Sequence, residues 1–338
     1  MMTKFKISVF VLIFSTTLFA QDIHFSQPIL APLNLNPALS GANYDYAAYV
    51  NYKTQWRSVT VPYKTIGASY DMRIRAKKSK SGYFGAGLNF FRDNAGTIDI
   101  ATTIVNLNLA YHLYLNKTST LGAGLYGGFT QRSLNLSKGT WGNQYTGKQF
   151  DAGLPTGEVF NAEQFGFVDA GAGVLYRYDK AEGNMTSNDN LKVNVGVAVF
   201  HVGEPNYSFV SNEKESLSKR FSFFANGEIG ISSTNVALSP ALYYNQQGKA
   251  TEIIVGSYVI YQLQDASKYT GLVQGLRTSV GAFYRNKDAV ILSGMLQWSN
   301  YGLGISYDLN TSSLAEASKR KGGIEVSLKY TGIKSKSK

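Results

Sequence analysis

Apolar side chains alternate with polar or small ones through many short segments of this 338-residue chain. In residues 105–115, every odd-numbered position is Val, Leu or Tyr, whereas the even-numbered positions are Asn, Ala, His or Tyr. Residues 121–129 and 301–310 repeat the alternation, with mostly glycine or polar residues opposite the apolar ones. A period of two is typical of β-strands, because successive side chains point to opposite faces of a sheet. The chain is therefore predicted to be all-β, with one apolar face on each strand.

Charged residues within these segments lie mainly on the face opposite the apolar one. In a soluble β-sandwich the inner faces would be apolar and the charged faces exposed. Here the apolar face would be a large exposed patch in water, whereas lipid would cover it. Closing the sheet then satisfies the backbone, so we predict a transmembrane antiparallel outer-membrane β-barrel. The charges predicted to line its lumen are Asp71, Arg73, Arg75, Asp169, Arg177, Arg277 and Arg285.

Fourteen segments carry the alternation, in agreement with the even strand number of bacterial single-chain barrels. They are residues 44–53, 63–75, 83–92, 98–115, 119–132, 166–179, 190–202, 220–231, 235–245, 251–262, 272–286, 289–299, 301–310 and 323–331. Both chain termini are then expected on the periplasmic side, so that connections after odd-numbered segments are extracellular. The two longest of these connections lie near residues 133–165 and 203–219.

Two irregularities are expected within the segments. Pro240 has no N–H to donate, so it requires a bulge or a position at which the ladder needs no donor. Ile98 and Ile100 are out of phase with Leu107, and a bulge in the fourth segment is the expected cause.

The first twenty residues have the pattern of an export signal. Lys4 and Lys6 precede an apolar run from Ile7 to Phe19, and Ala20 stands before the predicted cleavage point. The run is too short to span a bilayer as a helix, and no later stretch is apolar for long enough. Because the chain contains no cysteine, it has no disulfide, no thiolate–metal site and no lipidated cysteine.

The formal charge of +11 falls to about +9 when the export signal is removed. Export makes nucleic acid an unsuitable partner, and no basic run is interleaved with aromatic residues as in a nucleic-acid groove. The lysines gather instead in predicted turns and in the C-terminal tail. We interpret them as solvated connections, with anionic lipid headgroups or an acidic partner as the alternative.

Enzymatic and metal sites are not indicated. His24, His112 and His201 share no helix, and the chain has no HExxH motif, no GxSxG motif and no carboxylate cluster at metal-ligand spacing. His112 is predicted to be a hydrogen-bonded lumen residue. Asp169 and Asp308 are predicted, like Glu228, to pair with lumen arginines. No catalytic residue, metal or cofactor is therefore predicted.

Both ends of the chain resemble the PorP/SprF family, outer-membrane proteins of the type IX secretion and gliding machinery of Bacteroidota. The resemblance rests on QD at residues 21–22, FSQ at 25–27, NPAL–G at 36–41, QW at 55–56, a following proline and an S–D pair. The matching residues are Phe25, Ser26, Gln27, Asn36, Pro37, Ala38, Leu39, Gly41, Gln55, Trp56, Pro62, Ser69 and Asp71. Residues 306–314 and 322–330 also resemble the end of the family, whereas nothing specific matches between about 130 and 220.

The resemblance implies a fourteen-stranded, non-catalytic barrel in the cell outer membrane. Such a barrel would assist the export and surface attachment of a secreted adhesin with a cognate C-terminal domain, and would contact periplasmic parts of the secretion ring. The expected division of the chain is a signal peptide (1–20), a lead segment (21–42), the barrel (43–331) and a basic tail (332–338).

The resemblance also gives the lead segment a role. Pro28, Pro32 and Pro37 prevent it from adding a strand to the sheet, so we expect it across the periplasmic mouth or inside the lumen. The alternative is a flexible terminus.

Two functions remain open from the sequence. The first is a plugged interaction protein whose extracellular loops hold a secreted partner through Trp141, Tyr145 and Phe150. The second is a porin-like channel for small solutes, in which inward arginines give a preference for anions.

Overall fold

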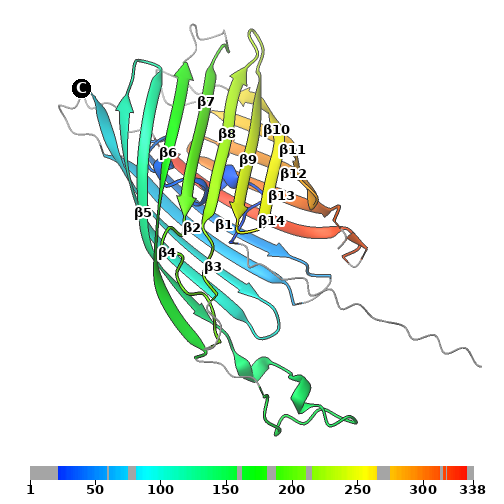
Figure 1. The fold of residues 1–338 in the computed structure, drawn as a ribbon. Helices are drawn as coiled ribbons and strands as arrows, with labels where there is room; N and C mark the ends of the chain where they lie inside the picture. The colour runs from blue at the N-terminus through cyan, green and yellow to red at the C-terminus, as the bar shows by residue number, and fades with distance from the viewer. Residues whose placement is uncertain are drawn as a thin grey trace, which may run out of the picture.

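Fourteen antiparallel strands close into one barrel in the part of the chain that the structure describes (Figure 1). This computed structural model describes residues 22–58, 61–74, 81–157, 162–180, 188–210, 215–264, 275–312, 315–316 and 318–332. The predicted signal peptide, Arg75 and residues 333–338 of the predicted tail lie outside these ranges. Each strand pairs with its neighbours in sequence, and β1 pairs with β14 to complete the ring.

The strands follow the predicted segments closely. They are β1 (Tyr46–Gln55), β2 (Tyr63–Ile74), β3 (Gly82–Ala95), β4 (Ile100–Tyr114), β5 (Ser119–Ser133), β6 (Gln164–Lys180), β7 (Leu191–Phe200), β8 (Arg220–Gly230), β9 (Val236–Gln247), β10 (Ala250–Gln264), β11 (Leu276–Arg285), β12 (Ala289–Trp298), β13 (Tyr301–Asn310) and β14 (Lys321–Gly332). The predicted fold class, a barrel of about fourteen strands with a non-strand lead, is confirmed.

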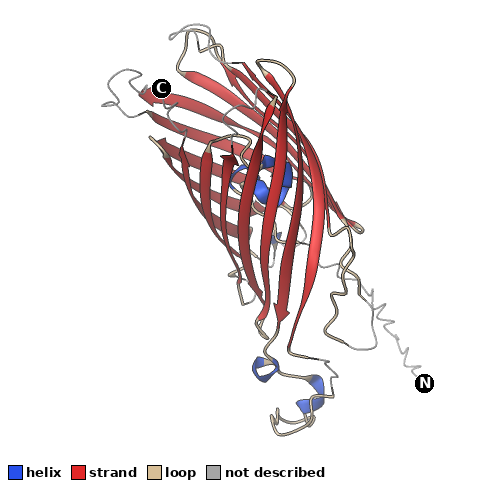
Figure 2. Cartoon of the chain, turned by 90° about the vertical axis from the view of Figure 1, so that its left-hand side faces the viewer, coloured by secondary structure: helices blue, strands red, loops and turns tan. Residues whose placement is uncertain are grey.

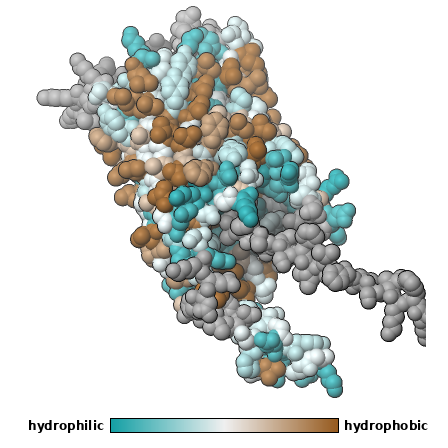
Figure 3. All heavy atoms as spheres, in the orientation of Figure 1, coloured by the Kyte–Doolittle hydropathy of each residue, from teal (hydrophilic) through white to brown (hydrophobic). Residues whose placement is uncertain are grey.

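The two faces of the strands differ as the alternation predicts. Leu107 and Leu125 face outward and are 54% and 65% exposed, whereas Asn108 and His112 face inward and are each 1% exposed. Figure 3 shows apolar side chains spread over the barrel wall. Removing such side chains from water stabilises a protein by about 25 cal/mol per Å². Lipid against the outer wall supplies that stabilisation without a second sheet.

Pro240 lies in β9 where one hydrogen-bonded ladder is interrupted. Between β8 and β9, the register runs from the Asn226–Ala241 pair to the Ile229–Leu238 pair, with no pairing opposite Pro240. The register on the β10 side is continuous. Pro240 therefore occupies a position that needs no ladder donor, one of the two predicted possibilities.

The bulge predicted for the fourth segment is wrong. β4 pairs with both β3 and β5 without any register shift. Ile104 instead packs inside the barrel against a cluster that contains Phe25, Ala31 and Phe91. With the register continuous, Ile100 lies on the same inward face as Ile104, where the lumen side of β4 meets the apolar lead segment.

The longest connections follow β5 and β7, at residues 134–163 and 201–219. The first contains η3 (Leu136–Lys138) and η4 (Gly142–Gln144), which project beyond the end of the barrel (Figure 2). Outer-membrane barrels carry their longer loops outside the cell, so we assign this end to the extracellular side. The opposite end, where β1 begins and β14 ends, is then periplasmic. The helices in the described part of the chain are each no longer than about one turn, and none of them could span a membrane.

Candidate functional site

The lead segment, predicted as residues 21–42, is described from Asp22, continues to Asp45 directly before β1, and lies inside the barrel (Figure 2). It contains three short helices, η1 (Pro28–Leu30), α1 (Pro32–Leu35) and η2 (Pro37–Leu39), each of which begins with a proline. Proline is favoured at the first helical position because it has no N–H to leave unpaired there. The next proline disfavours the helical conformation in the residue before it, so η1 and α1 stay short. This spacing keeps the lead compact and prevents it from pairing as a strand.

Asn36 attaches the middle of the lead to the barrel wall. Its Nδ2 donates hydrogen bonds of 3.0 Å to the carbonyl oxygens of Val174 on β6 and Val197 on β7. Its Oδ1 accepts from the N–H of Ala38 at 2.8 Å and so caps η2. The side chain is fully buried, and an amide satisfies both requirements because it has donors and acceptors.

Inward glycines on the barrel make room for the lead backbone. A Cβ at Gly85 would overlap the carbonyl oxygen of Ser40, and a Cβ at Gly124 would lie 2.5 Å from the nitrogen of Ala38. By contrast, nothing lies within 4 Å of the Cβ position of Gly127, an outward residue of the same strand as Gly124. The glycine rows of the alternating segments therefore form the seat of the lead, a close approach that side chains would block.

The periplasmic end of the lead is held by charged residues of β2 and β6. The Asp71 carboxylate accepts from the N–H of Gly41 at 2.8 Å. Arg73 donates to the carbonyl oxygens of Gly41 and Ala42 at 3.0 and 2.7 Å, and Arg177 also donates to Ala42. Gly41 has a φ of +65°, a conformation that favours glycine. Three of the predicted lumen charges thus converge on one turn of the lead.

His112 contributes to the same end from β4. Its Nε2 lies 2.9 Å from the carbonyl oxygen of Ser40 and donates to it. The ring stacks on Tyr83 at a centroid distance of 4.6 Å. This geometry agrees with the predicted role of His112 as a hydrogen-bonded lumen residue.

The FSQ motif contacts charged residues of β11, β13 and β14. The Glu325 carboxylate accepts from the N–H groups of Ser26 and Gln27 at 2.6 and 3.2 Å. The Ser26 hydroxyl donates to Asp308 at 2.8 Å and accepts from Arg285 at 3.1 Å. Arg285 also pairs with Asp308 at 3.0 Å, as predicted for a lumen arginine. Charged groups on three strands therefore bind two consecutive residues of the lead.

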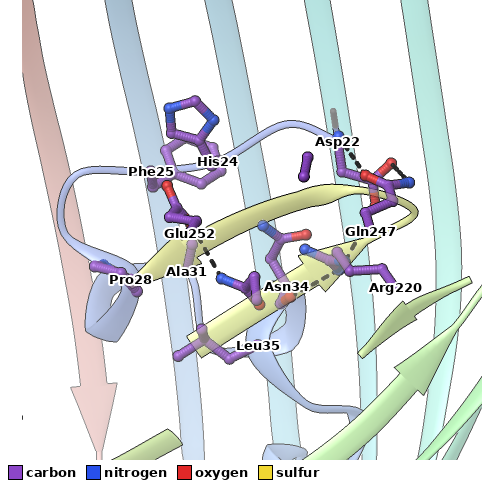
Figure 4. Close-up of a pocket in the computed structure, with 12 residues that line it drawn as sticks. Asp22, His24, Phe25, Pro28, Ala31, Asn34, Leu35, Arg220, Gln247 and Glu252 are labelled. Carbon is purple, nitrogen blue, oxygen red and sulfur yellow. Dashed lines mark hydrogen bonds and ion pairs between the residues drawn. The ribbon is translucent and has the colours of Figure 1, made fainter. Parts of the chain in front are cut away.

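Asp22 anchors the lead near the extracellular end of the barrel (Figure 4). Its carboxylate pairs with Arg220 Nε at 3.1 Å and accepts from Gln247 Nε2 at 3.1 Å. Gln247 Oε1 also accepts from the N–H of Asp22 at 2.9 Å. Arg220 donates in turn to the carbonyl oxygen of Asn34 at 3.1 Å. These contacts place the two ends of the lead at opposite ends of the lumen.

His201 joins two carboxylates at this anchor. Its Nε2 donates to Asp22 at 2.6 Å and its Nδ1 donates to Asp169 at 2.7 Å, while Asp169 also accepts from the Tyr126 hydroxyl at 2.6 Å. Burial lowers the pKa of His201, but the two carboxylates outweigh burial and raise the pKa from 6.5 to about 9. Burial raises the pKa of Asp22, but His201 and Arg220 hold it below its usual value. The anchor is therefore an ion pair with charge-assisted hydrogen bonds at neutral pH.

Three other motif residues, Gln55, Trp56 and Pro62, do not reach the lead in the described contacts. Gln55 ends β1, and Trp56 has a φ of +56° and packs edge-on against Tyr63 at 4.8 Å. Pro62 lies in the same extracellular connection, directly before β2. Their positions shape the β1–β2 turn.

The predicted partner contacts lie in the long extracellular connection after β5. Tyr145 and Phe150 pair across an isolated bridge and are 58% and 47% exposed. Trp141 precedes η4, and its indole ring lies over Gly139. These aromatic residues are far from the lead and form a separate surface.

The contacts that hold the extracellular end of the lead, through Glu325 and through the Asp22–His201 pair, were not predicted from the sequence. Glu325 stands in inward phase in β14, between Ile324 and Val326, so its lumen position could have been found from the alternation. No comparable signal connects Asp22 with His201, because they are 179 residues apart and both lie outside strands. Among the described residues, no group of three or more His, Cys, Asp and Glu side chains could hold a metal ion.

Comparison with protein families gives one match, described as "Type IX secretion system membrane protein PorP/SprF", which extends over residues 17–330. Comparison with curated proteins gives no match.

Similar solved structures are barrels of low sequence identity. The toluene transporter TbuX of Ralstonia pickettii has 9% identity and a TM-score of 0.47, with 90% of this chain and 93% of that chain covered. The deltaS2S3 mutant of the monoaromatic hydrocarbon channel TodX has 12% identity and a TM-score of 0.48, with coverage of 89% and 94%. BamA from Haemophilus ducreyi lacking POTRA domains 1–3 has 8% identity and a TM-score of 0.43, with coverage of 86% and 70%.

Proposed function

The chain belongs to the PorP/SprF family of type IX secretion system membrane proteins, and on this premise we propose that it acts as a plugged, non-catalytic barrel. As a multi-pass outer-membrane protein of that family, it is a component of the secretion apparatus. The proposed role is to assist the export and surface attachment of a secreted adhesin with a cognate C-terminal domain. On the periplasmic side, the barrel would contact the secretion ring.

The lead segment is the observation that carries this proposal. A solute channel needs an open lumen. Here the wall residues Asp71, Arg73 and Glu325 form hydrogen bonds with the lead, and Asn36 of the lead donates to the wall. Buried polar groups of this kind cost about 1–3 kcal/mol each when they lose their partners. Displacing the lead would therefore leave several buried polar groups unpaired at once. The barrel is for this reason better suited to binding than to conduction.

The extracellular surface offers a place for the secreted partner. Tyr145 and Phe150 are exposed on a loop that projects from the barrel. Exposed aromatic residues commonly provide the anchoring contacts of protein interfaces. We assign Trp141 to the same surface.

Surface display of the adhesin tests the proposed role. Cells that lack this protein should secrete and display much less of the adhesin encoded nearby, and the full-length protein should restore display. Unaltered display in cells without the protein would contradict the proposal. A barrel lacking residues 22–40 tests whether the lead itself is required.

A porin-like channel for small anions is the second candidate. Cationic side chains at the periplasmic end, among them Arg277 and Lys192, favour it. Conductance of the intact barrel separates the two candidates, since a plugged barrel should not conduct.

A further inference from the structure

A cavity of about 310 Å³ lies between the lead and the periplasmic half of the barrel wall. We call it the periplasmic vestibule. Leu35, Leu39 and Tyr44 of the lead form its inner side, and the wall is formed by side chains that include Arg177, Lys192, Glu228, Arg277, Gln297 and Lys329. Lys192 is 41% exposed and Arg277 28% exposed, so solvent reaches the vestibule.

Positive side chains outnumber negative ones around the vestibule. Arg177 is already committed to Asp179 at 2.6 Å and to the lead. The Glu228 carboxylate is shared by Arg277 at 3.1 Å and Lys192 at 3.7 Å. Two cations thus depend on one carboxylate, which leaves positive charge that an incoming anion would neutralise.

Lys329 adds a further cation with no carboxylate partner among the described ion pairs. Its Nζ donates to the hydroxyl of Tyr44 at 2.8 Å and lies 4.6 Å from the centre of that ring. The neighbouring cation lowers the pKa of the Tyr44 hydroxyl, although burial opposes the change. Lys329 therefore gives the vestibule a third positive group, one that pairs with none of the acids that the structure describes.

Neutral amides complete the lining. Asn194 donates to Asn226 at 2.9 Å, and Gln297 lines the cavity beside Arg277, its partner in the β11–β12 register. Side-chain amides have both donors and acceptors, so they can pair with the N–H and C=O groups of a peptide. The volume is at the lower end of the range for ligand pockets and admits a short segment only.

We infer that the periplasmic vestibule binds a carboxylate-bearing peptide segment of a periplasmic protein. This inference rests on the proposed function and identifies where the barrel would meet the secretion ring. The charge favours an anion, and the amides favour a peptide over inorganic phosphate. Lipid headgroups are a poorer fit, because lipid contacts the outside of the barrel while the vestibule lies inside it.

Peptide binding to the full-length, detergent-solubilised barrel tests the inference. A labelled tetraglutamate peptide with a free C-terminus should bind saturably, and tetraglutamine amide should not. Arg277→Gln should weaken binding about tenfold or more, the effect of losing a charge-assisted contact. Glu228→Gln should strengthen binding, because it frees Arg277 and Lys192, and an effect of that sign is not expected from a merely structural residue.

A matched control comes from the opposite end of the barrel. Lys219 is 42% exposed there and pairs with Glu204, so Lys219→Gln removes one charge without touching the vestibule. It should leave peptide binding unchanged. Heat-dependent mobility on gels should verify that every variant is folded.

Three results would overturn the inference. These are no preference for tetraglutamate over tetraglutamine amide, equal loss of binding in Lys219→Gln and Arg277→Gln, and full competition by inorganic phosphate at the peptide's own concentration. Failure of the proposed function has a different result. In that case the peptide still binds and responds to Glu228→Gln, but adhesin display is normal in cells without the protein.

Discussion

The His201 ring donates a 2.6 Å hydrogen bond from Nε2 to the carboxylate of Asp22. This contact ties the N-terminal end of the lead to the connection between β7 and β8, at the extracellular end of the barrel. The other end of the lead joins β1 at the periplasmic side, where the N–H of Asp45 donates to the carbonyl oxygen of Gly332 at 3.1 Å. The lead therefore crosses the lumen from one mouth toward the other.

The anchor should weaken as the pH rises. Since the pKa of His201 is raised from 6.5 to about 9, its stabilising contribution is complete below 6.5 and is lost as the pH passes through 9. The charged groups that face it are Asp22 on the lead, Asp169 on β6 and Arg220 on β8, with the Tyr126 hydroxyl on β5. Amide exchange of residues 22–27, corrected for the intrinsic rate, should increase between these pH values. Equal protection of these amides below pH 6.5 and above pH 9 would contradict the raised pKa assigned to His201.

Replacing an inward glycine that contacts the lead by a larger residue should displace the lead. Gly124→Val puts a branched side chain against the backbone of Ala38, and overpacking of this kind costs about 1–3 kcal/mol. Limited proteolysis should then cut the lead while the barrel stays folded. Gly127→Val on the same strand faces outward into open space and serves as the matched control. Protection of the lead in the Gly124 variant would count against a tightly seated lead.

Asn36 should tolerate no replacement, and aspartate should be worse than alanine. Asn36→Ala removes three hydrogen bonds and should lower the free energy of unfolding by about 1–3 kcal/mol. Asn36→Asp retains the shape but points a carboxylate at two carbonyl oxygens, so its loss should be larger. Urea unfolding in lipid measures both, with the exposed Asn43→Ala as control. Equal stability of the two Asn36 variants would contradict the assigned hydrogen bonds.

The aromatic residues of the long extracellular loop should affect partner binding and leave the barrel intact. Replacing Tyr145 and Phe150 together with serine removes two exposed anchors, each worth about 1–2 kcal/mol at a typical interface. Adhesin display should fall while the unfolding midpoint stays unchanged. A variant with normal display would remove this loop from the proposed partner surface.

Local sequence pattern was sufficient for the strands but not for the lead. The period of two places each strand because it depends on neighbours within one segment. The contacts of the lead join residues as far apart as Ser26 and Glu325, 299 positions away, and no local period encodes such a pair. The bulge wrongly predicted in β4 has the same origin, because apolar residues on the inward face of β4, such as Ile104, pack against the lead residue Phe25. The family motifs identified the buried lead residues without indicating their partners.

Conductance in planar bilayers tests the plugged barrel most directly. The intact protein should show no large, steady pore, because the lead is fixed to the wall at Asp22, Asn36 and Gly41. Deletion of residues 22–40 should open one, and anions should pass preferentially past the inward arginines. A large open pore in the intact barrel, unchanged by the deletion, would contradict the account.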